Sequence, residues 1–133
     1  MKFHLGDILS VTHGRLVSPT HIGGVYKICN FLTDDDLYTH QLPRVYAECK
    51  AHLLALHPQL NQIPLIGEDE AKERQERDGP RWWALWLDAR VAEYGEYLEV
   101  TPIPKGIHEY KDPIIEAEEM VGPDNVIVIK ESE

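Results

Sequence analysis

Two apolar stripes at helical spacing constrain the fold of this chain more than any other feature. They are Ile22, Val25, Cys29 and Leu32, and Tyr46, Cys49, Leu53 and Leu56, each spaced by three, four and three residues. Such spacing places the members of a stripe on one face of an α-helix, and that face must be buried. Pro19 after Ser18 and Pro43 after Leu42 stand where the two helices would start. We therefore predict two amphipathic helices that share one core.

Shorter patterns predict the remaining elements. They are strands at 8–11, 97–103 and 126–129, and helices at 80–94 and 112–122. Together with the two amphipathic helices, they predict an α+β fold in a single domain over residues 1–133, with about four helices packed on a small sheet of about three strands. The Gly23-Gly24 pair leaves open whether the first helix begins at Pro19 or after the pair. We interpret the pair as a packing device, with close approach of a ligand as the alternative.

Residues 67–79 form a charged segment with hardly anything apolar to bury. Their mixed signs at helical spacing favour either a solvated helix or a mobile linker. In both cases the segment has few apolar side chains to bury against the rest of the domain, so we expect high mobility there.

The helix predicted at 80–94 is apolar on two sides rather than on one. Trp82 and Trp86 fall on one side, and Trp83 and Leu87 fall on another. A helix of this kind must be covered twice, so it is either central to the fold or meets a second copy of the chain. We therefore predict a homo-oligomer that forms through Trp82–Tyr94.

The negative charge of the chain is concentrated in its second half. The formal net charge is −10; residues 1–60 carry five basic and five acidic side chains, whereas residues 61–133 carry eight and eighteen. Such a surplus repels a phosphate backbone, which disfavours direct binding of nucleic acid. It favours a protein partner with a basic surface, and we place the acidic contact at Glu116, Glu118 and Glu119.

Cysteine usage and hydropathy bear on the compartment. The chain has two cysteines, Cys29 and Cys49, which is too few for the disulfide framework of a small secreted domain. Both lie on predicted apolar helix faces, where a thiol is usually an inert core residue. No apolar run approaches the roughly 18 residues that a membrane span needs. We expect a soluble, cytoplasmic protein without a membrane segment.

Polar residues near the two predicted helix starts are the candidate binding residues. His13, Arg15 and Ser18 flank Gly14, and an arginine fork beside free backbone N–H groups suits an anion. The alternative is a turn in which Arg15 makes a surface salt bridge. The second group stands at the start of the Pro43 helix and suits either recognition of a polar partner or local capping. Its members are Tyr38, His40, Gln41 and Arg44.

Histidines and carboxylates in the first half raise the question of a metal. Six of the seven histidines precede residue 58, and Asp34, Asp35, Asp36 and Glu48 lie among them. Imidazole and carboxylate are ligands of zinc, manganese and iron. No His-x-x-x-His or His-x-His pair occurs, however, and ligands would have to converge from separate elements. We therefore assign no metal, no cofactor and no catalytic residue.

Several motifs also resemble a known group of proteins. LGDILSVTHGRLVSP at 5–19, THQLPR at 39–44, and WLDARVAEYGEYLEV with DPIIEAEEMVGPDNVIVIKE in the second half are similar to a family of small uncharacterised proteins encoded by bacteriophages and prophages. The resemblance assigns no activity. It implies a phage accessory protein that acts in the bacterial cytoplasm. Small acidic proteins of that kind often bind and inhibit a host enzyme or a defence complex.

Two functional hypotheses follow. The first is a small acidic phage accessory protein, without catalysis, whose second half binds and modulates a host or defence-system macromolecule. The second is a small-molecule or nucleotide-binding protein, with hydrolase or transferase activity open to it, that uses His13, Arg15, His40 and Arg44. The second hypothesis requires a concave pocket that holds at least three of these four residues. We favour the first.

Overall fold

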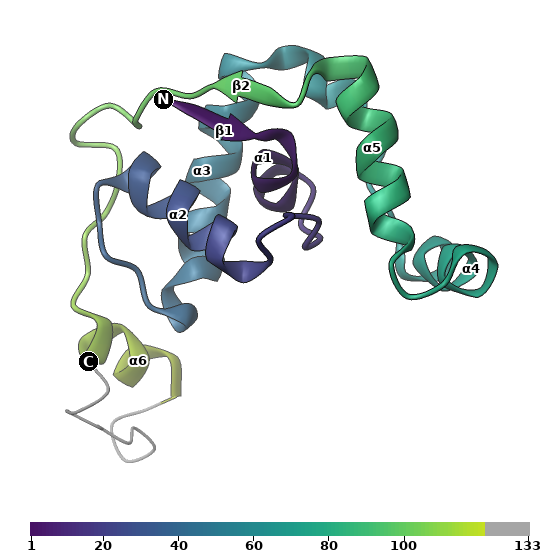
Figure 1. Cartoon of the computed structure of the whole chain (residues 1–133). Helices are drawn as coiled ribbons and strands as arrows, with labels where there is room; N and C mark the ends of the chain where they lie inside the picture. Colours follow the sequence, from purple (N-terminus) through teal and green to yellow (C-terminus); the bar gives the residue numbers. More distant parts are fainter. Residues whose placement is uncertain (122–133) are drawn as a thin grey trace.

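A body of three helices forms the centre of the fold. The computed structural model describes residues 1–121, in which α1 (Leu5–Thr12), α2 (Ile22–Thr33) and α3 (Leu42–Leu56) pack against one another. Figure 1 shows α1 and α2 in front of α3. Short 3-10 turns, η1 (Thr39–Gln41) and η2 (Pro58–Gln62), lie on either side of α3. The body therefore comes from the first half of the chain.

Helix α1 is the most deeply buried element of the body. All eight of its residues are buried, because α2, α3 and α5 (Trp82–Tyr94) surround it. The imidazole of His4 caps it by accepting a hydrogen bond from the Gly6 N–H at 2.9 Å. The predicted strand at 8–11 is wrong, since a short helix that is buried on every side shows no one-sided apolar pattern with a helical period.

The two predicted amphipathic helices are present as α2 and α3. The buried residues of α2 include Val25, Cys29 and Leu32, but Ile22 is exposed because the helix starts there and not at Pro19. The expected cap, Ser18, donates its hydroxyl hydrogen to Asp7 instead. Helix α3 begins at Leu42 with Pro43 in its first turn, as its sequence predicts.

A small sheet and more helices than expected complete the fold. Strand β1 (Lys2–His4) pairs antiparallel with β2 (Tyr97–Glu99), with Phe3 opposite Leu98. Within residues 1–121 there are two strands and six helices, so the fold is mostly helical and the predicted counts of three and four are wrong. The predicted strand at 97–103 is shorter than expected, and the predicted strand at 126–129 lies outside the described residues.

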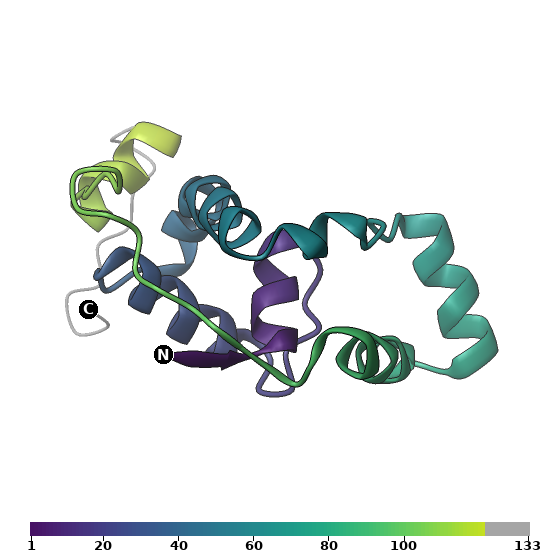
Figure 2. The ribbon, with the colours of Figure 1, turned by 90° about the horizontal axis from the view of Figure 1, so that it is seen from above.

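Helices α4 (Glu68–Asp78) and α5 form an arm that leaves the body. Helix α5 packs on α1 and buries Trp82, Trp86 and Leu87. Helix α4 has α5 as its main packing partner, and none of its residues is buried. In Figure 2 the arm extends from one end of the molecule, with α4 farthest out. The segment at 67–79 thus forms a helix over most of its length. Its mobility stays a prediction.

A long connection leads from β2 back across the body. We call residues 100–112 the strap; it ends at α6 (Pro113–Val121), whose predicted start at Asp112-Pro113 is confirmed. Figure 2 shows it passing α2 and α3 on its way to α6. The N–H of Ile103 donates to the carbonyl of Leu32 at 2.9 Å, which joins the strap to α2. No helix of residues 1–121 has the length and apolar character that crossing a bilayer requires.

Candidate functional site

Helix α3 and the turn before it carry a row of polar side chains that faces the strap. His40, Arg44, Glu48 and His52 follow one another at intervals of four residues, and His57 caps the end of the helix. Residues four apart lie on one face of a helix. We call these five residues the polar stripe, and each of them contacts the segment from β2 to α6.

Three histidines of the polar stripe bind backbone carbonyls. The Nε2 atom of His57 lies 2.7 Å from the carbonyl oxygen of Glu99, and that of His52 lies 2.7 Å from the carbonyl oxygen of Thr101. His40 Nε2 lies 2.7 Å from the Pro113 carbonyl oxygen. Because a carbonyl only accepts, each imidazole donates its N–H. These hydrogen bonds hold the segment from β2 to α6 against α3, where it makes few backbone-to-backbone hydrogen bonds.

Arg44 forms a two-pronged ion pair with Glu116 of α6. Arg44 Nε and Nη2 donate to Glu116 Oε2 and Oε1 at 2.9 and 3.0 Å, and Nη1 donates to the carbonyl of Glu109 at 2.8 Å. Buried Gln41 adds hydrogen bonds to Glu116 and to the carbonyl of Lys111. The guanidinium lowers the pKa of Glu116, and the carboxylate raises the pKa of Arg44. The pair fixes α6 against the start of α3.

His108 of the strap is held between two carboxylates. Its Nε2 lies 2.9 Å from Asp35 Oδ2, its Nδ1 contacts the carboxylate of Glu48, and its side chain is 4% exposed. An ionised carboxylate only accepts, so a ring nitrogen of His108 that carries a proton donates it to the carboxylate that it faces. The ring of Tyr110 packs edge-on against His108, and its hydroxyl donates to the carbonyl of Thr33 at 2.8 Å.

A cavity of about 540 Å³ opens beside His108, between the end of α2 and the strap. We call it the strap cavity. Its lining is mainly apolar and is listed here: Phe31, Thr33, Asp34, Pro102, Ile103, Pro104, Lys105, Gly106, His108 and Tyr110. A volume of this size lies in the range of small-ligand sites.

The first group of candidate residues lies elsewhere. His13 Nε2 donates to the carbonyl of Ile63 at 3.0 Å, and Arg15 reaches the carbonyl of Ile66 at 3.4 Å. Burial lowers the pKa of His13. Ser18 is buried against Asp7. His13 and Arg15 thus hold the segment after α3, whereas His40 and Arg44 hold α6, so the four residues of the ligand hypothesis belong to two separate contacts.

The second group and the acidic residues meet in one place. Tyr38 stands at the entrance to α3 with its ring near His40, and its N–H donates to the side chain of Gln41 at 3.0 Å. Glu116 is 4% exposed and paired internally, so it is not part of an acidic surface as the sequence suggested. Glu119 is exposed and pairs with Lys111 at 2.8 Å, and Glu118 is half-buried beside it.

The residues that sequence reasoning missed are those around His108. The sequence suggests Asp35 and Glu48 only as metal ligands, and it suggests no role for His108, which stands apart from the other six histidines. The signal that could have pointed to the stripe is the four-residue spacing of His40, Arg44, Glu48 and His52. Among the described residues, no three His, Cys, Asp or Glu side chains are arranged to hold a metal ion.

Comparison with known protein families finds a match in the first half of the chain. Residues 3–63 match the model of a domain of unknown function, DUF7736. The match runs from β1 to η2, so it contains the three-helix body and the polar stripe but neither the arm nor the strap. No curated protein and no solved structure matches the chain.

Proposed function

We propose that this protein is a non-catalytic phage accessory protein that binds and modulates a host or defence-system macromolecule through a basic surface on that partner. The observation that carries the proposal is the arm. Helix α4 lies at the outer end of the molecule, buries none of its residues, and is charged along its whole length. Only Ala71 of this helix packs, partly buried, against the core, so the charged side chains are available for contact with another molecule.

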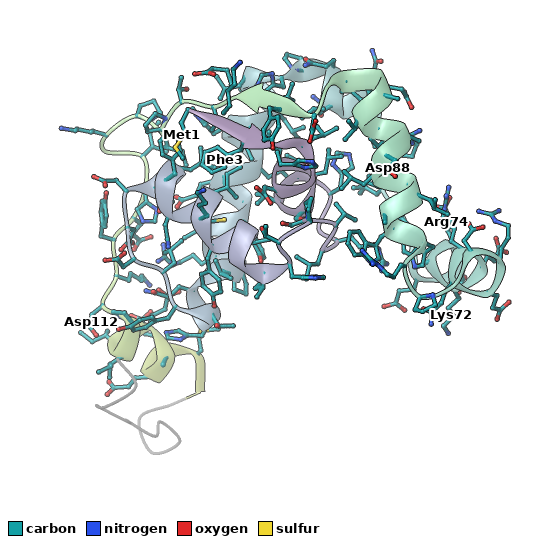
Figure 3. All side chains as sticks on the ribbon, viewed as in Figure 1. Met1, Phe3, Lys72, Arg74, Asp88 and Asp112 are labelled. Carbon is teal, nitrogen blue, oxygen red and sulfur yellow. The ribbon has the colours of Figure 1, made fainter. Side chains whose placement is uncertain are left out.

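The charge of α4 decides the kind of partner. The helix has six acidic side chains, of which Glu70 and Asp78 pair with Arg74 and Arg77 on the same helix. Figure 3 shows Lys72 and Arg74 at this outer end. The other acidic side chains are exposed and are Glu68, Asp69, Glu73 and Glu76. An exposed negative surface attracts a positive one over about a Debye length and orients it before contact.

The phage origin and the bacterial cytoplasm rest on the resemblance described above. Its first two motifs, at 5–19 and 39–44, supply α1, the loop that follows it, and the start of α3. They therefore belong to the three-helix body that matches the domain of unknown function. A cytoplasmic site also agrees with the two buried, free thiols of Cys29 and Cys49.

Capture from a bacterial lysate tests the proposal. Immobilised protein should retain a partner in stoichiometric amount, and retention should weaken as sodium chloride is raised. Reversing charge on α4 with Glu73→Lys and Glu76→Lys should abolish retention. The matched control is Glu118→Lys with Glu119→Lys, which changes the net charge equally at α6, where the sequence suggested the contact. Because Glu119 pairs with Lys111 and Glu118 is half-buried, we expect this variant to leave retention intact. No retained partner at any salt concentration, or equal loss in both variants, would contradict the proposal.

Self-association through α5 remains part of the proposal. Next to the buried Trp82 and Trp86, α5 exposes Leu85, which is 60% accessible, together with Ala89 and Ala92. These positions follow one another at helical spacing, and the small alanines would allow a second helix to approach closely. The support is thus an apolar row on the outside of the arm.

A further inference from the structure

We propose that the strap cavity binds the side chain of an arginine or lysine presented by a partner protein. This inference deepens the proposed function, on which it rests, because it names the group that the partner contributes. The cavity lies on the body rather than on the arm, between the end of α2 and the strap. It is therefore a second contact, separate in the structure from the acidic helix α4.

The walls of the strap cavity suit a long apolar stem. Phe31, Ile103 and Tyr110 line it together with Pro102 and Pro104. Arginine and lysine carry three or four methylene groups that pack along apolar surface while the charged end reaches a polar site. Aromatic faces also attract a cation that lies over them. The apolar wall can therefore contact the methylene groups of such a side chain, and the two aromatic rings can contact its charged group.

The end of α2 gives the cavity a negative pole. The last carbonyl groups of a helix carry partial negative charge, and those of Thr33 and Asp34 lie here, where they accept from the hydroxyl of Tyr110 at 2.8 and 3.3 Å. Asp34 itself lines the cavity and is exposed. Tyr110 is thus fixed beside an electronegative helix end.

Charge across the whole cavity favours a cation over an anion. Asp34 is in the lining, and Asp35 and Glu48 lie directly behind His108, to which they are bonded. Against these three carboxylates stands Lys105, and a positive charge on His108 would still leave the sum of charges negative before the helix end is added. An anion would face carboxylates and carbonyl oxygens, and an uncharged apolar group would leave Asp34 without a counterpart.

A capped peptide, acetyl-Gly-Arg-Gly-amide, provides the direct test. Its control replaces arginine with citrulline, which has nearly the same shape and no charge. Titration into the uniformly nitrogen-labelled full chain should shift amide signals at 31–34 and 102–110. We expect the citrulline peptide to bind at least tenfold more weakly. Equal binding of the two peptides, shifts confined to other residues, or no shifts at millimolar peptide would overturn the inference.

Three variants locate the site. Asp34→Asn removes the charge and keeps a residue that tolerates the positive φ of 52° at this position, so it should weaken arginine-peptide binding at least threefold. Lys105→Gln removes the opposing charge and should strengthen binding about twofold, an effect that misfolding cannot imitate. Asp88→Asn on α5 should change nothing (Figure 3). Unchanged affinity in both Asp34→Asn and Lys105→Gln would exclude the cavity.

The two proposals fail in different ways. Retention of a lysate partner that depends on Glu73 and Glu76 but not on Asp34 would sustain the acidic arm and overturn the cavity. Arginine-peptide binding at the cavity without any retained partner would overturn the proposed function and sustain the cavity as a cation site.

Discussion

The pair of Arg44 and Glu116 joins residues 72 positions apart, and its loss should be measurable. Glu116→Gln removes a charged acceptor from a buried site and leaves the guanidinium without its partner. We expect the free energy of unfolding at pH 7 to fall by about 1–3 kcal/mol in chemical denaturation. Glu119→Gln, at an exposed pair, should leave stability nearly unchanged.

The effect of Glu116→Gln should depend on pH. Because Arg44 lowers the pKa of Glu116 in the folded protein, the unfolded chain takes up a proton first as the solution is acidified. The stabilisation is therefore complete above the ordinary carboxyl pKa of about 4.3 and is lost as the pH falls through the lowered value. The gap between wild type and variant should narrow below about pH 4; a constant gap would show that the charge is not responsible.

Gly23 and Gly24 give a matched pair of substitutions. A Cβ at Gly24 would overlap the Asp7 carboxylate and the Ser18 hydroxyl, whereas one at Gly23 meets nothing within 4 Å. Gly24→Ala should lower the free energy of unfolding by about 1–3 kcal/mol. Gly23→Ala, in the first turn of α2, should raise it by roughly 0.5 kcal/mol. Thermal denaturation of both variants checks the sign. Equal effects would contradict close packing at Gly24.

At the scale of elements, His108 should control the attachment of the strap. His108→Gln keeps a polar side chain but leaves at least one of Asp35 and Glu48 without its donor. Amides of the strap should then exchange with solvent about tenfold to a hundredfold faster, while amides of α1 should keep their rates. Hydrogen exchange read by mass spectrometry distinguishes these regions. An equal rise in both would mean global destabilisation instead.

The exposed face of α5 gives the second prediction at this scale. Light scattering at micromolar concentration should report a dimer, and Leu85→Glu should convert it to a monomer by placing a charge on the apolar row. Leu65→Glu, at an equally exposed leucine before the arm, is the control and should remain dimeric. A monomer mass for the wild type would refute self-association through α5.

The molecule as a whole should protect its thiols until it unfolds. Cys29 and Cys49 are fully buried where α2 meets α3, and the neighbouring Cys29 thiol together with burial raises the pKa of Cys49. A thiol reagent such as Ellman's should label them slowly in buffer, at a rate that follows the fraction of unfolded chain as urea is added. Rapid labelling of native protein would show that this core opens locally.

Sequence patterns predicted the elements whose burial is one-sided. Helices α2 and α3 follow from their apolar stripes, and α6 follows from Asp112, whose side chain caps it by accepting from Ile114 and Ile115. Figure 3 marks Asp112 at this helix start. Helix α1 could not be predicted, because burial on all sides removes the period on which the reasoning depends. The short strand β1 leaves an equally weak signal, whereas β2 lies within the strand predicted at 97–103.

Sequence patterns could not predict which polar residues meet. Nothing local to His108 indicates Glu48 and Asp35, which lie 60 and 73 positions away. Gln41 and Arg44 are near each other in the sequence and both bind Glu116, but the sequence suggests Glu116 for a different, acidic surface. Long-range pairing of this kind is decided by the path of the strap, which no spacing rule specifies.

The pairing of β1 with β2 has a consequence for synthesis on the ribosome. Phe3 lies opposite Leu98, so the first strand is complete long before its partner has been made. At about 5–20 residues per second, translation leaves β1 alone for roughly 5–20 s. During that interval the edge of β1 has no strand to pair with in the nascent chain. Pairing of β1 with β2 must therefore be a late step in the folding of each newly made chain.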